Sequence, residues 1–150
     1  MTLYNRENAR VPEQRAEMER LEADGVCLFC DAVRTPRKPG SFRTRWWVAS
    51  ANEFPYRGTR LHYLLAPTEH VVDLLELPDH VLADFWVALR RLSAEHDLGF
   101  YGLGARCGDC RYTGGTIAHV HVHVVVGDVE DPAHEPVRLK LSSRPATGRA

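Results

Sequence analysis

Three histidines at alternate positions, His119, His121 and His123, are the residues of this 150-residue chain with the clearest chemical potential. An imidazole can act as a nucleophile, transfer a proton or bind a metal ion near neutral pH. Valines alternate with them and continue to Val126, and this pattern predicts a buried strand with all three imidazoles on one face. The outer two would then lie about 13 Å apart, too far for one metal ion to bind all three. We therefore expect the three rings to have different roles.

Four cysteines occur as two closely spaced pairs, Cys27 with Cys30 and Cys107 with Cys110. We expect no secretion signal and a location in the cytoplasm, where such pairs more often serve metal or redox chemistry than structural disulfides. Composition alone allows all four cysteines to hold one zinc ion. The second pair could also be a redox or auxiliary metal site, or two free thiols in a surface loop.

Composition is typical of a soluble globular protein, with 44% hydrophobic residues, 26% charged residues and a formal net charge of −1. Because this balance gives no general attraction to polyanions, we expect neither nucleic acid nor a membrane as a partner. The chain also lacks an apolar run of about 18 residues that could span a bilayer. Its length suits a single domain over residues 1–150, with a core over about 27–142 and a frayed C-terminus after it.

Hydrophobic periodicity predicts the elements that must position these side chains. The expected helices cover about residues 12–24 and 78–97, with a short one after Thr68. The expected strands cover residues 42–50, 61–66, 100–106, 117–126 and 137–141, with a loop over 35–40. This order and its short links indicate an α+β fold, in which an antiparallel sheet of about five strands carries one long helix and a short helix.

Several separated segments resemble the histidine triad (HIT) superfamily of nucleotide hydrolases and transferases. The alternating histidines, preceded by Gly114, Gly115 and Thr116, are similar to its signature. Residues 27–30 look like the Cys-x-Phe-Cys of zinc-carrying members, and residues 62–70 resemble the family's His-hydrophobic-Pro-x-x-His stretch. Residues 52–56 resemble a segment of the dinucleoside polyphosphate phosphorylase-like branch. These matches cover residues 27–126 in order and imply a HIT-like fold.

The resemblance implies a structural zinc site in the first half of this pattern. Zinc-carrying members complete the cysteine pair with the histidine after the proline and with the first histidine of the triad. The implied ligands are therefore Cys27, Cys30, His70 and His119, a tetrahedral set of two sulfur and two nitrogen atoms. The four-cysteine site remains an alternative at this stage.

The resemblance also implies covalent catalysis. His121 matches the family nucleophile, whose neutral imidazole attacks the α-phosphorus and holds a nucleotidyl-histidine until an acceptor removes it. Its second nitrogen should donate to a backbone carbonyl, whose position the sequence does not reveal. His123 is expected to donate to the α-phosphate oxygens.

Six residues are expected to contact the nucleotide. They are Phe29, Asn52, His62, Gly114, Gly115 and Thr116. The glycine turn suits close approach of backbone N–H groups to phosphate. Phe29 matches a base-stacking position and Asn52 a ribose-binding one, although a core side chain and a turn former are the plain alternatives. His62 could instead support the triad from behind.

The resulting hypothesis is a zinc-containing nucleotide hydrolase or nucleotidyl transferase that acts at the α-phosphorus of a purine nucleotide or dinucleoside polyphosphate. One alternative is a phosphate-dependent phosphorylase, and another is a nucleotide-binding regulatory module with a thiol-sensitive loop at Cys107 and Cys110. A metalloenzyme with catalytic zinc is the least favoured. Many HIT hydrolases carry Gln where this chain has Gly115, and the phosphorylase-like branch commonly replaces His123 by Gln, so the acceptor stays open. The family also implies a homodimer.

Overall fold

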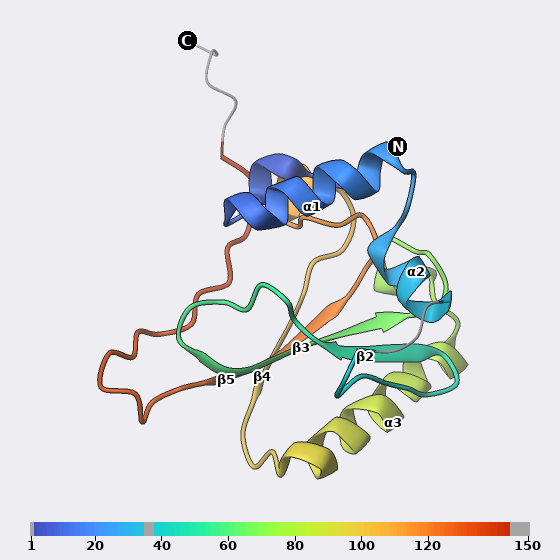
Figure 1. The fold of residues 1–150 in the computed structure, drawn as a ribbon. Coiled ribbons are helices and arrows are strands. Elements are labelled where there is room, and N and C mark those ends of the chain that lie inside the picture. Colours follow the sequence, from blue (N-terminus) through green and yellow to red (C-terminus); the bar gives the residue numbers. More distant parts are fainter. Residues whose placement is uncertain (1, 35–37, 145–150) are drawn as a thin grey trace.

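A five-stranded antiparallel sheet forms the centre of the computed structural model, which describes residues 2–34 and 38–144 (Figure 1). Its strands are β1 (Phe42–Arg43), β2 (Trp47–Ala51), β3 (Thr59–Pro67), β4 (Gly102–Ala105) and β5 (Val122–Gly127). They lie in the order β1-β2-β3-β5-β4, so β3 and β5 pair at the centre and β4 forms an edge. The predicted α+β class with five antiparallel strands is confirmed.

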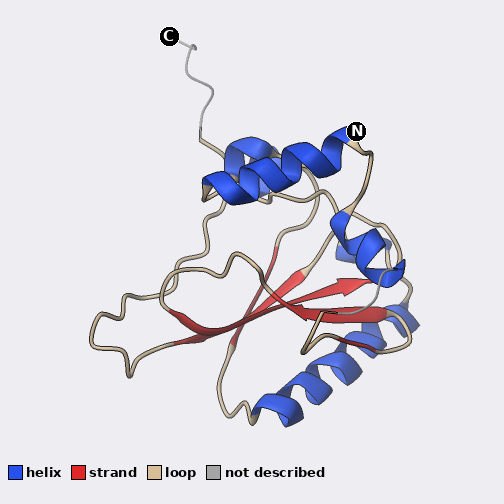
Figure 2. Ribbon diagram, viewed as in Figure 1, coloured by secondary structure: helices blue, strands red, loops and turns tan. Residues whose placement is uncertain are grey.

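Helices lie on both sides of this sheet (Figure 2). They are α1 (Pro12–Ala23), α2 (Leu28–Arg34), α3 (Asp79–His96) and α4 (Cys110–Thr113), with short 3-10 turns η1 (Arg6–Asn8) and η2 (Leu74–Glu76). The long helix α3 covers one face, whereas α1 and α2 lie on the other side. Trp47, Leu65, Leu92 and Val124 are fully buried in the core between α3 and the sheet. None of the helices in the described residues has the length and apolarity of a membrane span.

In the segment that contains the three histidines, successive side chains alternate between two faces as predicted. The strand itself, β5, begins at Val122 rather than at residue 117. Val120 and Val122 belong to the core that α3 covers. The three histidines are also buried but lie on the opposite face, where His121 contacts Phe29 and His123 contacts His62. Pairing with β3 and β4 begins only at Val122, because the preceding residues bond to loops instead, as in the 2.8 Å bond from the Val120 N–H to a carbonyl after β3. The first two histidines therefore lie in an irregular segment.

The single strand expected over residues 42–50 is in fact a tight antiparallel pair, β1 with β2. A turn separates the two strands, and the Asp84 carboxylate on α3 stabilises it. This carboxylate accepts hydrogen bonds from the Thr44 hydroxyl and from the Trp46 N–H, each at 2.7 Å. A half-buried acceptor from a distant helix thus interrupts a pattern that is locally typical of a continuous strand.

Four other expectations concern the segment after Thr68, the loop over residues 35–40 and the C-terminal end. Neither the strand expected over 137–141 nor the short helix after Thr68 is present, and both segments are irregular. The C-terminal segment instead follows the sheet edge, where the Lys140 carbonyl accepts hydrogen bonds from Arg106. Residues 35–37 of the expected loop and 145–150 of the expected frayed end lie outside the described residues.

Gly58 is required where the loop before β3 meets the C-terminal segment. Its φ is +79°, and a Cβ atom there would lie 2.2 Å from the carbonyl oxygen of Glu135. We predict that Gly58→Ala lowers the free energy of unfolding by about 1–3 kcal/mol or more, because backbone strain and a steric clash act together. Gly99→Ala is the control, since a Cβ there meets nothing within 4 Å. Chemical denaturation that gives both variants equal stability would contradict the prediction.

Candidate functional site

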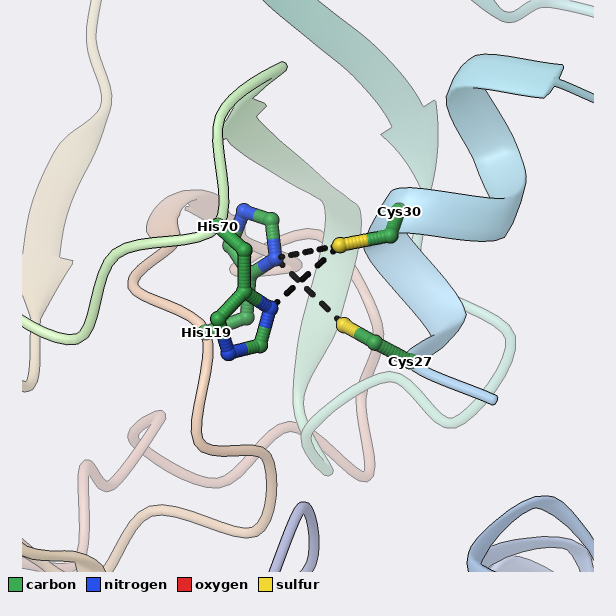
Figure 3. A group of neighbouring side chains, drawn as sticks. All are labelled: Cys27, Cys30, His70 and His119. Atoms are coloured by element: carbon green, nitrogen blue, oxygen red, sulfur yellow. Dashed lines mark hydrogen bonds between the residues drawn. The ribbon is translucent and has the colours of Figure 1, made fainter. Parts of the chain in front are cut away.

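Cys27, Cys30, His70 and His119 converge on one point beside the sheet (Figure 3). Cys27 precedes α2 and Cys30 lies within it, whereas His70 follows β3 and His119 precedes β5. The four donor atoms lie within 4.8 Å of one another. The distance from Sγ to Nδ1 is 3.4 Å between Cys27 and His119, 3.3 Å between Cys30 and His70, and 3.6 Å between Cys30 and His119.

These distances fit a tetrahedral zinc ion. With Zn–S near 2.3 Å and Zn–N near 2.0–2.1 Å, tetrahedral geometry separates sulfur from nitrogen by about 3.5 Å. His119 is oriented for this role, because its Nε2 lies 3.0 Å from the Pro67 carbonyl and donates to it, which leaves the Nδ1 lone pair facing the thiols. Burial also lowers the pKa of His119 to about 4, so the ring is neutral, as a ligand must be.

The second pair of cysteines lies elsewhere. Cys107 packs at the margin of the main core, and Cys110 is the first residue of α4, next to Gly115. Among residues 2–34 and 38–144, neither belongs to a group of side chains that could hold a metal ion, so the mixed cysteine–histidine set forms rather than the four-cysteine alternative. Both thiols are free, and burial raises the pKa of Cys110, which disfavours its reactive thiolate.

His121 is 6% exposed and has one nitrogen in a fixed hydrogen bond. Its Nδ1 lies 2.8 Å from the carbonyl oxygen of His119. A carbonyl can only accept, so Nδ1 carries the proton and Nε2 keeps its lone pair. Burial lowers the pKa of His121 to about 4, and the ring is therefore neutral at pH 7. The backbone carbonyl that the sequence did not reveal is thus only two residues away.

A chain of hydrogen bonds determines which nitrogen of His123 carries the proton. The backbone N–H of Tyr56 donates to His62 Nδ1 at 3.1 Å, so His62 carries its proton on Nε2. This Nε2 lies 2.8 Å from His123 Nδ1, which accepts the hydrogen bond. His123 therefore carries its own proton on Nε2. Burial lowers the pKa of both rings, that of His62 to about 4 and that of His123 further, so both are neutral.

A cavity of about 240 Å³ is lined by His121 and His123. Some of its other lining residues are apolar, namely Leu21, Phe29, Val48, Leu64 and Ile117. Others are polar or basic, namely Asn8, Arg10, Arg106, Arg138 and Lys140. The Phe29 ring lies 4.8 Å from the ring of His121, whereas Arg106 Nη1 lies 3.2 Å from Nε2 of His123. The cavity therefore has an apolar surface beside His121 and a cationic surface beside His123.

The six residues expected to contact a nucleotide divide into two groups. Those that line the cavity are Phe29, Asn52, Gly114 and Thr116. His62 does not line it but contacts His123 from behind. Gly115 also lies outside the lining, and its carbonyl accepts a 2.8 Å hydrogen bond from the Asn8 side chain. The Asn52 side chain also contacts its neighbours, because its Oδ1 accepts from the Phe54 N–H at 3.0 Å and its Nδ2 lies 3.2 Å from His62 Nε2.

Several residues that line the cavity were not identified from the sequence, among them Asn8, Arg10, Arg106 and Lys140. Asn8 is 2% exposed, and its side chain amide donates to the Cys110 and Gly115 carbonyls, which joins the N-terminal segment to the glycine turn. Arg106 donates from Nε and Nη2 to the Lys140 carbonyl and from Nη1 to the Tyr56 hydroxyl. These partners are distant in sequence, and no local pattern marks them.

Known proteins share this fold. A HIT family hydrolase from Clostridium thermocellum is 22% identical, with a TM-score of 0.57 over 71% of this chain and 94% of that chain. A Zn-bound histidine triad family protein from Mycobacterium smegmatis is 21% identical, with a TM-score of 0.54 over 80% of this chain and 84% of that chain. A histidine triad nucleotide-binding protein from Candida albicans is 20% identical, with a TM-score of 0.55 over 68% and 76%. No curated protein matches the sequence.

At these identities the structural likeness establishes the fold alone. The sequence itself matches the HIT domain family over residues 47–130. This match covers more than half of the chain and includes β2 to β5 with all three alternating histidines. The chain therefore belongs to the HIT domain family.

Proposed function

We propose that this protein is a nucleotide hydrolase or nucleotidyl transferase that attacks the α-phosphorus of a purine nucleotide or dinucleoside polyphosphate through His121. The observation that carries this proposal is the 2.8 Å hydrogen bond from His121 Nδ1 to the His119 carbonyl. This bond leaves Nε2 of the neutral ring unprotonated, with its lone pair available, and the ring lines the cavity. Membership of the HIT domain family supports it. So does the fold shared with a HIT family hydrolase and a histidine triad nucleotide-binding protein.

The first step forms a bond from His121 Nε2 to phosphorus and breaks the phosphorus bond to the leaving group, which departs with the electron pair. Positive charge then develops on the imidazole, and the His119 carbonyl stabilises it through the Nδ1 proton. The Nε2–H of His123 donates to oxygens on which negative charge accumulates. In the second step an acceptor oxygen forms a bond to phosphorus and the bond from phosphorus to Nε2 breaks. Nε2 recovers its electron pair, so His121 returns to its neutral form, and the proton of a water acceptor is released to solvent.

The cavity suits the other parts of such a substrate. Phe29 and its apolar neighbours supply a surface on which a purine can pack. Gly114 ends α4 with φ +74°, and a Cβ there would lie 3.0 Å from the Lys140 carbonyl, so only glycine fits this turn. Together with the Thr116 hydroxyl, the turn provides polar groups for phosphate oxygens at the cavity wall.

Replacing His121 by Asn tests the nucleophile. Asn removes the attacking nitrogen but keeps an amide N–H for the His119 carbonyl. We expect turnover to fall by more than about 10³-fold, and the nucleotidyl adduct to be missing from the mass spectrum of the intact protein, while nucleotide affinity stays within about threefold. His80→Asn is the control, because that exposed ring packs on Trp46 away from the cavity. Turnover by His121→Asn equal to that of the control would refute the assigned role.

We also propose that Cys27, Cys30, His70 and His119 hold a structural zinc ion. The ligand spacing supports this, and so does the shared fold with a Zn-bound histidine triad family protein. Bound zinc would cross-link α2, the loop after β3 and the segment before β5. Because the four protein donors complete a tetrahedron, the site favours a stabilising role over a catalytic one. The expected benefit is a fixed backbone at His119, whose carbonyl orients His121.

Removing one ligand tests the zinc proposal. We expect about one zinc ion per chain in the purified protein. Cys27→Ser should lose most of this zinc, and its free energy of unfolding should fall by about 3 kcal/mol or more. Cys107→Ser is the matched control, since this cysteine lies outside the cluster. Metal analysis that finds equal zinc in the two variants would exclude the assigned ligand set.

The family resemblance further suggests a homodimer, which we propose to form at the β4 edge of the sheet. Trp86 on α3 is 53% exposed and Leu103 on β4 is 46% exposed, and both line one apolar groove. We expect Trp86→Glu to convert a dimer into the 17.0 kDa monomer in light-scattering measurements. Tyr112→Glu, which changes an even more exposed aromatic side chain on α4, should remain dimeric. A Trp86→Glu protein with the mass of the wild type would count against this interface.

A further inference from the structure

Three cations meet at one side of the cavity, although they come from distant parts of the chain. Arg10 precedes α1, Arg106 follows β4 and Lys140 lies in the C-terminal segment, and all three line the cavity with His123. Burial lowers the pKa of Arg10 and of Lys140, and the positive charge of Arg106 lowers both further. The cavity therefore contains mutually repelling charges, which an anion would stabilise.

These cations have no carboxylate partners within the part of the chain that the structure describes. The ion pairs of the described residues involve other cations. Three carboxylates also line the cavity, those of Glu17, Asp31 and Glu53, and Glu53 pairs with Lys38 at 2.6 Å. Arg10 contacts the Tyr56 ring and the Phe54 and Pro55 carbonyls. The polar contacts of Arg10, Arg106 and Lys140 are all with neutral groups, so the three charges remain available to a ligand.

Arg106 and His123 present two donors to the same space. His123 carries its proton on Nε2, because its Nδ1 accepts from His62. Arg106 Nη1 lies 3.2 Å from this Nε2, so neither group can accept from the other. An anionic oxygen beside both N–H groups would satisfy both donors with charge-assisted hydrogen bonds. Arg106 is held ready for it by the Lys140 carbonyl, at 3.0 Å from Nε and 2.8 Å from Nη2.

The contacts of the two histidines indicate which part of a substrate meets the cations. Phe29 contacts His121, whereas Arg106 contacts His123. A nucleotide with its base against Phe29 and its α-phosphorus at His121 Nε2 therefore extends its leaving group toward His123 and the basic side. A leaving group made of further phosphates would place several negative charges among the three cations.

We propose that Arg10, Arg106 and Lys140 form a subsite for the phosphates of the leaving group, with Arg106 as its specificity-determining residue. This inference rests on the function proposed above, since it assumes attack by His121. The subsite selects substrates whose leaving group is a phosphate chain over substrates whose leaving group is a neutral amine. Binding of the phosphate chain itself does not require turnover, and it can be measured separately.

Tripolyphosphate binding, measured by titration calorimetry at fixed salt, tests the subsite directly. Arg106→Gln should bind tripolyphosphate about 10- to 100-fold more weakly, the loss expected for a charge-assisted hydrogen bond. Lys140→Gln should weaken binding about 3- to 10-fold and leaves the backbone carbonyl that Arg106 contacts in place. Arg60→Gln is the matched control, because Arg60 also lacks an ion pair among the described residues and contacts the Phe100 ring. Equal losses in Arg60→Gln and Arg106→Gln, or no loss in either, would overturn the subsite.

The leaving-group assignment is tested by comparing a nucleoside polyphosphate with a nucleoside phosphoramidate that has the same base. Arg106→Gln should lower kcat/KM for the polyphosphate about 10- to 100-fold and for the phosphoramidate less than about threefold. Equal losses for both substrates would show that Arg106 acts at the α-phosphate or through His123, and would overturn the assignment. So would a nucleoside diphosphate product that forms only with added inorganic phosphate, because the cations would then bind the acceptor.

The two proposals fail in different ways. A wild-type protein that turns over neither substrate contradicts the function proposed above. Tripolyphosphate affinity still decides whether Arg10, Arg106 and Lys140 bind a phosphate chain. Circular dichroism of each variant separates a lost contact from a lost fold, and Lys140→Gln provides a second test of the subsite.

Discussion

The hydrogen bond from His121 Nδ1 to the His119 carbonyl is the constraint on which the rest of the site depends. An imidazole in solution exchanges its proton between two nitrogens and rotates freely, whereas a carbonyl two residues away holds one tautomer in one orientation. Burial adds to this, because the charged form loses hydration and the ring remains neutral. The irregular backbone before β5 makes the contact possible, since a regular strand would direct the His119 carbonyl toward a neighbouring strand. The departure from strand geometry is therefore part of the chemistry.

His119 connects two sites that would otherwise be independent. Its Nδ1 faces the cysteines, its Nε2 donates to the Pro67 carbonyl and its own carbonyl orients His121. The proposed zinc ion would thus act on the proposed nucleophile, His121, only through a fixed backbone. His62 has a similar indirect role at the other histidine, because the Tyr56 N–H sets its tautomer and thereby that of His123. In both cases a backbone group, which cannot change its donor or acceptor character, determines the state of a titratable ring.

The two ends of the described chain complete the cavity. The N-terminal segment is tied to the histidine segment by the Tyr4–Ile117 bridge, and Asn8 joins it to the glycine turn. The C-terminal segment crosses the same region, where Lys140 bonds Asn8 through its side chain and Arg106 through its carbonyl. Apart from the short 3-10 turn η1, these segments are irregular near the site, and hydrogen bonds that involve side chains hold them there. They contribute the basic side of a cavity whose apolar side comes from the helices and the sheet.

Sequence alone determined the features that depend on local backbone geometry. The alternation of histidine with valine separated a buried apolar face from a chemical one, and the three- and four-residue spacing predicted α3, because side chain direction follows the period of the backbone. The resemblance to the HIT superfamily also implied the four cysteine and histidine residues that cluster in space. Tertiary structure alone decided where β5 begins, how Asp84 divides the strand expected over residues 42–50, and that Arg10, Arg106 and Lys140 share one cavity. Those outcomes depend on contacts between segments that are tens of residues apart, and local periodicity carries no information about which distant groups will meet.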